Sequence, residues 1–360
     1  MKKMNLEGLE ALLMTESPSS AEDEVSHFIE TFNESICKIE KDAIGNTFMT
    51  FPDNNGPIVM IAAHCDEIGL QVVHVTEDGY IRFRPIGGVD IKTLAGRQVN
   101  ILSASGKIHG VICKTPIHIE LIEKNEKPVE WSDLWIDIGC SSREEAASLV
   151  SIGDIISFCP NYLHLNNSRI ASKALDNKLG VFVALSAMKK LAGLSLTANN
   201  PVAVFTVQEE IGCKGASIAA HALRPSWCIC IDVGVASDCP GISVEKYGRL
   251  VLGEGPGLSY NTDICRPLTD QAAMILREEG IPFQKTTGLS ATGGTDTMRI
   301  QVAGNGIPCI LLSIPLRGMH TAAEVCDMKD ISITVDAVVA LVKKIHYENS
   351  LSDRKRPLWI

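Results

Sequence analysis

The sequence predicts an α/β fold in which a mostly parallel central sheet carries helices on both faces and a small all-β domain is inserted. Two observations favour this fold. Continuous apolar runs, typical of strands buried on both faces, alternate with segments of helical spacing. Between residues 69 and 164, short β-rich pieces are instead separated by turns, with a single helix expected near 143–149. We therefore expect a discontinuous domain at residues 1–68 and 165–360 and an inserted β-rich domain at 69–164.

The elements of the discontinuous domain follow from local patterns. Apolar residues recur at helical spacing in 5–14, and Ser17-Pro18-Ser19-Ser20 is expected to cap a second helix whose first turn is acidic. The alternation of strands and helices after residue 172 implies a sheet of mainly parallel strands. Apolar strands are expected at 58–63, 202–207, 227–231 and 309–314. Helices are expected at 178–191, 215–223, 269–279 and 331–347.

The composition excludes several classes of protein. The chain has 360 residues, of which 45% are hydrophobic and 21% charged, so it is neither disordered nor collagen-like nor a coiled coil. Its formal net charge of −10 argues against nucleic acid or an anionic membrane as the main partner. No apolar run reaches the roughly 20 residues that span a bilayer. The twelve cysteines form no C-x-x-C pair, and many lie in apolar runs, which predicts a reduced, cytoplasmic protein.

Histidines and carboxylates follow the expected strands at their carboxyl ends. In open α/β sheets, ligands bind outside that edge. Four strands each deliver such a residue there, and one further acid stands just before the helix expected at 178–191. The candidate residues are His64, Asp66, Asp176, Glu209, Glu210, Asp232 and His320.

Each candidate has a plainer interpretation when it is taken alone. Asp176 could cap its helix, Glu209 and Glu210 could form a solvated turn, and His64 could be a core histidine. The coincidence of all of them at one edge favours a shared site. Two adjacent acids after a buried strand repel each other, and they cluster easily only if a cation compensates them.

This set of ligand types favours a hydrolytic metal site. Histidine, aspartate and glutamate without thiolate fit zinc, cobalt or manganese. The number of ligands suffices for two metals with Asp176 between them, which leaves each metal an open position for water. One of the two glutamates is then surplus and is a natural general base. Asp66 shares a strand face with His64 and suits a carboxylate that orients its imidazole.

Five ordered motifs resemble the signatures of the glutamyl/deblocking aminopeptidases, which are co-catalytic two-metal exopeptidases. Some members of that family assemble into tetrahedral dodecamers. The resemblance covers nearly the whole chain, and its specificity lies in the ordered set rather than in any single motif. The motifs are His64-Cys65-Asp66-Glu67-Ile68-Gly69, Ala174-Leu175-Asp176-Asn177-Lys178-Leu179-Gly180, Gln208-Glu209-Glu210-Ile211-Gly212-Cys213-Lys214-Gly215-Ala216, Asp232-Val233 and Met319-His320-Thr321.

The resemblance implies a role for each candidate. It implies that the chain binds two divalent ions. Zinc is the expected metal, and cobalt and manganese are the alternatives. It further implies peptide substrates with a free N-terminus, an inserted domain that mediates dimerisation, and a homo-oligomer between dimer and dodecamer. The implied roles are one metal on His64 and Asp232, the other on Glu210 and His320, Asp176 bridging, Glu209 as base and Asp66 orienting His64.

The sequence departs from the family pattern at two positions. Cys65 and Thr321 stand where methionine and serine are expected, and neither supplies a necessary ligand. Gly293-Gly294-Thr295-Asp296 resembles a loop that lines the substrate cleft, although a plain glycine-rich turn is an equal interpretation. Lys246, Arg249 and Arg317 are basic residues near the site segments that could select acidic side chains, or could be ordinary surface and ion-pair residues.

The predicted activity is metal-dependent hydrolysis of the N-terminal peptide bond of peptides. Three other functions remain open. A deacylase or amidohydrolase acting on small N-acyl substrates would use the same two metals. A glycoside hydrolase of the endoglucanase type would use paired acids without a metal. A non-catalytic oligomeric scaffold would keep the fold without turnover.

Overall fold

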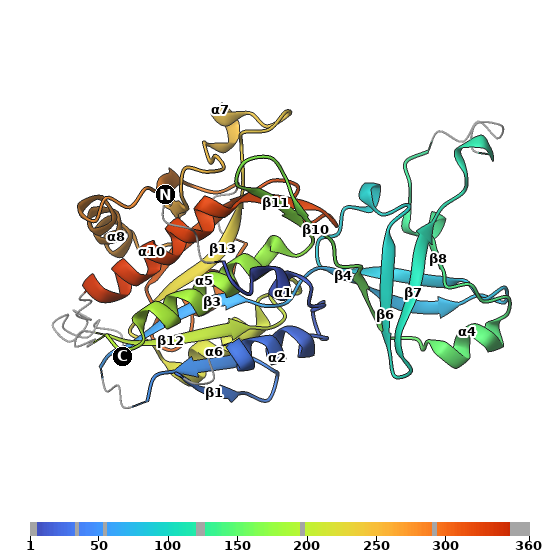
Figure 1. The fold of residues 1–360 in the computed structure, drawn as a ribbon, viewed down its shortest axis with the longest axis horizontal. Helices are drawn as coiled ribbons and strands as arrows, with labels where there is room; N and C mark the ends of the chain where they lie inside the picture. The colour runs from blue at the N-terminus through green and yellow to red at the C-terminus, as the bar shows by residue number, and fades with distance from the viewer. Residues whose placement is uncertain are drawn as a thin grey trace, which may run out of the picture.

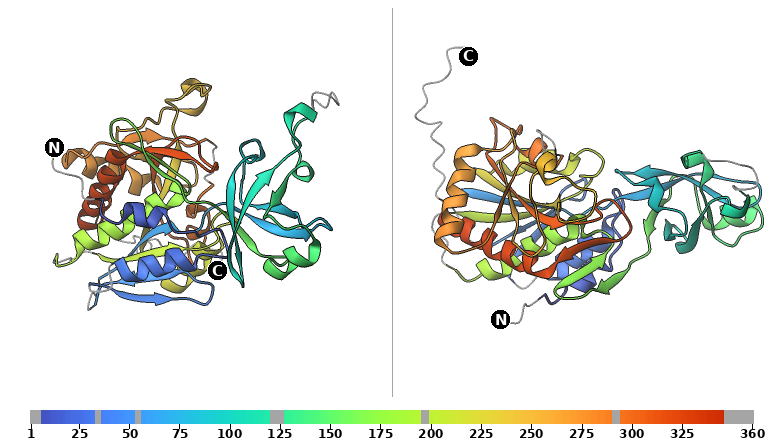
Figure 2. Two further views of the ribbon diagram at one scale, coloured as in Figure 1. Left: turned by 45° about the vertical axis from the view of Figure 1, so that its right-hand side comes forward. Right: turned by 90° about the horizontal axis from the view of Figure 1, so that it is seen from above.

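The computed structural model has two lobes, a larger α/β lobe and a smaller β lobe that stands beside it (Figures 1 and 2). The structure describes residues 6–32, 36–52, 56–119, 127–194, 199–289 and 294–345. The ends expected for the first helix at residue 5 and for the last helix at residue 347 lie outside the described residues.

The larger lobe is built on an eight-stranded mixed sheet. Its central strands β12, β3, β13 and β16 run parallel to one another, and antiparallel neighbours extend both edges. In sheet order the strands are β1 (Lys38–Lys41), β2 (Thr47–Thr50), β12 (Asn200–Thr206), β3 (Ile58–His64), β13 (Trp227–Val235), β16 (Cys309–Leu316), β14 (Gly257–Ser259) and β15 (Gln284–Thr286). The four apolar runs of the sequence are the four parallel strands.

Helices cover both faces of this sheet, because successive residues of its central strands point to opposite sides. Ile61 joins the large apolar cluster that contains residues of α5 and α10, which cross in front of the sheet in Figure 1. Its neighbours Met60 and Ala62 join a second cluster that contains residues of α6. The predicted fold class is therefore confirmed. The helices of this lobe are α1 (Leu9–Leu13), α2 (Asp23–Phe32), α5 (Leu175–Leu191), α6 (Lys214–Leu223), α7 (Val244–Tyr247), α8 (Arg266–Glu278), α9 (Thr297–Ile300) and α10 (Met328–Lys344).

Residues 17–20 do not cap the second helix, and that prediction is wrong. The helix begins at Asp23, and the preceding serines turn toward the segment that follows β3. The backbone N–H of Ser17 donates to Glu67 at 2.7 Å, and the hydroxyl of Ser19 donates to Asp66 at 2.6 Å. The carboxylates of Asp66 and Glu67 are buried, and a buried ionised group without hydrogen-bond donors is costly. The N–H groups at the exposed start of the helix can bond to water instead.

The smaller lobe is a closed six-stranded barrel with an apolar core of its own. Its strands all lie between Gly69 and Phe158, and its helix α4 (Arg143–Leu149), capped by Ser142, lies where the sequence predicts a helix. The division into domains at 68/69 and 164/165 stays a prediction. The barrel strands, in order around the barrel, are β4 (Gly69–Val75), β5 (Ile81–Ile86), β8 (Trp135–Asp137), β7 (Gly106–Cys113), β6 (Gln98–Ser103) and β9 (Ile155–Phe158).

A third, three-stranded sheet leads the chain back from the barrel to the α/β lobe. It contains β10 (Tyr162–His164), β11 (Arg169–Ser172) and β17 (Glu324–Asp327). Short 3-10 helices lie at Ile91–Thr93 and Trp131–Asp133. All twelve cysteines are unpaired. No helix in the described part of the chain is long and apolar enough to cross a membrane.

Candidate metal centre and active site

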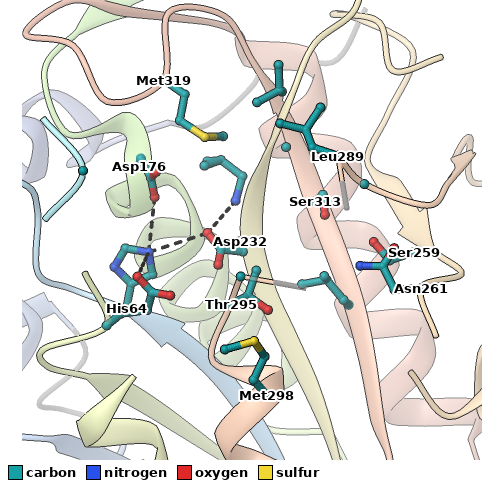
Figure 3. Close-up of a pocket in the computed structure, with 18 of the residues that line it drawn as sticks. His64, Asp176, Asp232, Ser259, Asn261, Leu289, Thr295, Met298, Ser313 and Met319 are labelled. Atoms are coloured by element: carbon teal, nitrogen blue, oxygen red, sulfur yellow. Dashed lines mark hydrogen bonds and ion pairs between the residues drawn. The ribbon is translucent and has the colours of Figure 1, made fainter. Parts of the chain in front are cut away.

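The candidate residues come together at the carboxyl edge of the central sheet (Figure 3). His64 is the last residue of β3, and Asp232 lies within β13, which runs on to Val235 instead of ending where predicted. Asp176 stands in the first turn of α5. Glu209 and Glu210 follow β12, and His320 follows β16. The parallel strands thus deliver their site residues to one edge.

One half of the site is formed by His64, Asp176 and Asp232. The Nε2 atom of His64 lies 3.2 Å from an oxygen of Asp176 and 3.6 Å from an oxygen of Asp232. The three side chains are buried, and their ligand-type atoms lie within 4.8 Å of one another.

The other half is formed by Asp176, Glu210 and His320. The Nε2 atom of His320 lies 3.4 Å from Asp176 Oδ2 and 3.6 Å from Glu210 Oε2. Asp176 therefore turns one carboxylate oxygen to each histidine, Oδ1 to His64 and Oδ2 to His320. Two sets of three nitrogen and oxygen donors that share one carboxylate fit a pair of divalent cations.

Both imidazoles are held with Nε2 facing the carboxylates. The Nδ1 atom of His64 lies 3.1 Å from the backbone oxygen of Asp66, and that of His320 lies 3.0 Å from the backbone oxygen of Gly88. A carbonyl oxygen only accepts, so Nδ1 carries a proton in each ring, and Nε2 is the nitrogen that can bind a metal once it is unprotonated. Gly88 follows β5 of the barrel, so the smaller lobe orients one histidine of the site.

Two buried acids hold the backbone of the site rather than its side chains. Asp66 accepts the backbone N–H groups of Glu209 and Glu210 at 2.9 and 3.2 Å. Glu324 does the same for Asp176 and His320, at 3.0 and 2.9 Å. The carboxylate of Asp66 lies 3.6 Å from His64 Nδ1, so the imidazole bonds to the backbone of Asp66.

Sequence reasoning missed Glu324. Its position four residues after His320 is a sequence signal that it lies near the site, but not of what it does there. Its role as a backbone acceptor depends on the packing of β17 against the site, which no local pattern reveals.

The site is rich in buried acidic groups. Burial raises the pKa of Glu209 to about 9 and that of Glu210 well above its usual value. Burial lowers the pKa of His64, but Glu209, Asp176 and Asp232 outweigh it, so the net shift is upward. The hydrogen bond with Asp176 raises the pKa of His320 to about 9. Groups that crowd like charges in this way are stabilised by bound cations.

Glu209 also belongs to a second cluster, which it forms with Cys213 and Asp296. The thiol of Cys213 donates to Glu209 Oε1 at 3.2 Å, and Asp296 belongs to the same buried cluster. Asp296 accepts a hydrogen bond from the Thr206 hydroxyl, and burial raises its pKa to about 7. Sequence reasoning assigned no role to Cys213 and considered Asp296 only within a cleft loop.

One side of a cavity of about 500 Å³ is formed by the acid–histidine cluster, which comprises His64, Asp176, Glu209, Glu210, Asp232 and His320. In Figure 3, His64, Asp176 and Asp232 gather on one side, while Ser259, Asn261, Ser313 and Leu289 lie on the other. Gly294 and Thr295, from the segment expected to line the cleft, also line the cavity, and Gly293 lies outside the described residues. A cavity with convergent polar groups at one side suits a small ligand or the end of a chain.

The remaining residues noted in the sequence lie away from the cavity wall. Cys65 is buried in the core of the larger lobe. The hydroxyl of Thr321 bonds to the backbone of Gly318. Arg249 pairs with Glu254 at 2.6 Å, and Arg317 pairs with Asp238 at 2.6 Å.

Comparison with known proteins identifies related sequences and structures. Residues 45–336 match the family described as M42 glutamyl aminopeptidase. A lysyl aminopeptidase of Pyrococcus furiosus is 33% identical over 312 residues, which cover 86% of this chain and 87% of that protein. A TET aminopeptidase from a marine sediment Thaumarchaeota archaeon is 30% identical with a TM-score of 0.89, covering 94% of this chain and 96% of the other. The TET1 peptidase of Pyrococcus horikoshii, described as assembling into a tetrahedron or a large octahedral shell, is 31% identical with a TM-score of 0.85, covering 94% and 99%.

Proposed function

Because the chain belongs to the M42 glutamyl aminopeptidase family and is thus a metal-dependent aminopeptidase, we propose that two divalent ions and Glu209 carry out its reaction. The reaction is the hydrolysis of the N-terminal peptide bond of a peptide. The observation that carries this proposal is the position of Asp176 between two histidines, with one carboxylate oxygen toward each. A carboxylate with one oxygen toward each histidine is suited to bridge the ions of a two-metal site.

The proposed ligands divide into two sets. His64 and Asp232 hold one ion, Glu210 and His320 hold the other, and Asp176 binds both. The donor set of nitrogen and oxygen atoms suits zinc, and it also suits cobalt or manganese. Asp66 and Glu324 keep these ligands in place through the backbone N–H groups that they accept.

When bound, divalent ions supply a water of lowered pKa and polarise the scissile carbonyl. Glu209 lines the cavity, is not needed in either ligand set, and lies 4.0 Å from His64 Nε2. It can therefore accept a proton from the attacking water and return that proton to the leaving amine. The thiol of Cys213, which donates to Glu209 Oε1, holds the carboxylate in position from the side. Cleavage at the chain end follows if the free amine of the substrate binds against the carboxylates of the site.

The other functions considered from the sequence fit these residues less well. A glycoside hydrolase would use two of the acids and leave His64, His320 and the bridging position of Asp176 without a role. A scaffold would have no reason to keep the complete set of ligands. A deacylase would use the same residues, so only the substrate distinguishes it from an aminopeptidase.

We further propose that the chain forms a homo-oligomer through the barrel lobe and acts in the cytoplasm. Support for an oligomer comes from the related TET1 peptidase, which is described as assembling into closed shells. The inserted barrel, at 69–164 in our division of the chain, is the proposed dimerisation domain. The number of chains in the oligomer, between two and twelve, can be determined by measuring its mass in solution.

The function can be tested with matched substrates. Purified protein is stripped with a chelator, reloaded with zinc, cobalt or manganese, and assayed on peptides with a free or an acetylated N-terminus. We expect hydrolysis of the free peptides alone, lost on chelation and restored by metal. Faster hydrolysis of acetylated substrates would indicate a deacylase. Activity on a β-glucan that survives chelation would indicate a glycosidase, and metal-loaded protein inert toward all substrates would indicate a scaffold.

A further inference from the structure

We propose that the cavity beyond the acid–histidine cluster selects an uncharged, mainly apolar side chain at the N-terminus of the substrate. This inference rests on the proposed aminopeptidase function and adds the class of residue that is removed. It separates this chain from the lysyl aminopeptidase to which it is similar, and from the glutamyl activity for which its family is described.

The first support is the charge of the cavity wall. Six ionisable acids and histidines line the described part of the cavity, and all six belong to the candidate metal centre and its base. The other lining side chains are uncharged, and they include the buried thiol of Cys213, which keeps its proton and donates a hydrogen bond to Glu209. Apolar contacts come from buried Leu250 and Leu311 and from Met298 and Met319.

The second support is that nearby basic residues have other partners or positions. Arg249 is paired with Glu254, and Arg317 donates to Asp238 through two nitrogens. Lys246 is exposed and lies 4.8 Å from the ring of Tyr247. Lys285 is exposed on β15, whose next residue Thr286 lines the cavity, so alternation along the strand turns Lys285 away from it. None of these four residues lines the described cavity wall, and the Lys246 ammonium lies on the ring of Tyr247, which does line it.

The third support is the polar groups of the wall. Ser259, Ser313 and Thr286 offer hydroxyls, and Asn261 offers an amide whose buried Oδ1 has no hydrogen-bond partner among the described residues. These groups can accept or donate hydrogen bonds, but they carry no charge. A lysine or glutamate side chain that enters this cavity loses its water without gaining an ion pair, which is costly. An apolar side chain gains from the same loss of water.

The test uses pairs of substrates of similar shape, one member uncharged and the other charged. Metal-loaded enzyme is assayed on short peptides that begin with norleucine or lysine, and with glutamine or glutamate. We expect kcat/KM to be about 100-fold higher for norleucine than for lysine, and glutamine to exceed glutamate in the same direction. Leucine and methionine should rank with norleucine.

A variant tests the position of the side-chain pocket. Asn261→Asp replaces an uncharged wall group with a carboxylate of nearly equal shape. We expect it to raise the ratio of lysine to norleucine turnover by about tenfold. The matched control is Asn167→Asp, which adds the same charge on an exposed turn and should leave the ratio unchanged.

The outcomes separate this inference from the proposed function. Highest kcat/KM on lysine or glutamate would overturn the inference and leave the aminopeptidase function standing. An unchanged ratio in folded Asn261→Asp would overturn the assignment of this wall to the substrate side chain. Hydrolysis of no free-amine peptide by metal-loaded protein would overturn the proposed function and this inference with it.

Discussion

Glu324 accepts the backbone N–H of Asp176 at 3.0 Å through one carboxylate oxygen. Its other oxygen accepts the backbone N–H of His320 at 2.9 Å. Asp66 has the same relationship to Glu209 and Glu210 on the opposite side of the site. Neither acid belongs to a proposed ligand set. Both fix the backbone from which ligands project, and positions of this kind tune a metal site as strongly as some ligands do.

Glu324→Gln should therefore weaken the site without removing a ligand. A glutamine offers one acceptor oxygen, so either Asp176 or His320 loses the partner of its N–H group. We expect metal affinity and kcat to fall by about 10- to 100-fold, and excess metal to restore part of the activity. Competition with a chelator and steady-state kinetics measure the two effects. Glu278→Gln, on an exposed turn of α8, is the control, and unaltered metal affinity in Glu324→Gln would contradict this role.

Removal of a shared ligand should affect both metal positions, whereas removal of an unshared one should affect only one. Purified protein should carry two divalent ions per chain. We expect Asp176→Ala to lose both ions, because both proposed sets contain this carboxylate. His320→Ala should lose about half of the metal and retain the ion held by His64. Elemental analysis measures the content, and His221→Ala, which removes an exposed histidine of α6, should leave it unchanged. Equal losses in Asp176→Ala and His320→Ala would argue against a shared ligand.

Glu209→Gln should separate catalysis from metal binding. The amide keeps the shape of the side chain but accepts a proton far less readily than the carboxylate does. We expect kcat to fall by about 10²- to 10⁴-fold while metal content stays constant. The control is Glu245→Gln on the exposed helix α7, which should retain full activity. A Glu209→Gln enzyme that keeps its kcat would remove this residue from the role of base.

The strands that position the site could be predicted because buried strands have continuous apolar sequences. The run at 58–63 is apolar throughout, and the run at 202–207 is apolar except for Thr206, since both faces of β3 and β12 are covered. The edge strands have no such apolar run. β1 is four residues long and mostly exposed, and β15 has only three residues, so their patterns do not differ from those of loops.

The ligand-type residues could be predicted because each lies within, or within a few residues of, a recognisable strand or helix. Residues that act through the tertiary fold could not. Ser19 was interpreted as part of a helix cap, since its donor role depends on Asp66, which is distant in the sequence. Glu324 contacts Asp176 across 148 positions of the chain, so only the folded backbone brings them together. Local patterns predict which residues a strand presents, but they do not predict what holds the loops that follow.

A buried carboxylate away from the metal centre gives the protein a pH-dependent stability. Asp330, in the first turn of α10, accepts the backbone N–H groups of Gly253 and Gly255 at 2.7 and 2.8 Å. These bonds favour its ionised form, but burial outweighs them and raises the pKa of Asp330 to about 6. The folded protein therefore holds this proton more tightly than the unfolded chain does. Unfolding releases the proton between about pH 4 and pH 6, so the contribution of Asp330 to stability falls as the pH rises through that range.

Asp330→Asn should abolish this dependence, because the amide does not titrate. The free energy of unfolding of the wild type, minus that of the variant, should fall by up to about 3 kcal/mol between pH 4 and pH 7. Urea denaturation at a series of pH values measures this difference. Asp336→Asn removes an exposed carboxylate of the same helix, which pairs with Lys190, and should give a nearly flat difference. A wild-type advantage over Asp330→Asn that grows with pH would mean that the two glycine N–H groups, rather than burial, determine the charge state of Asp330.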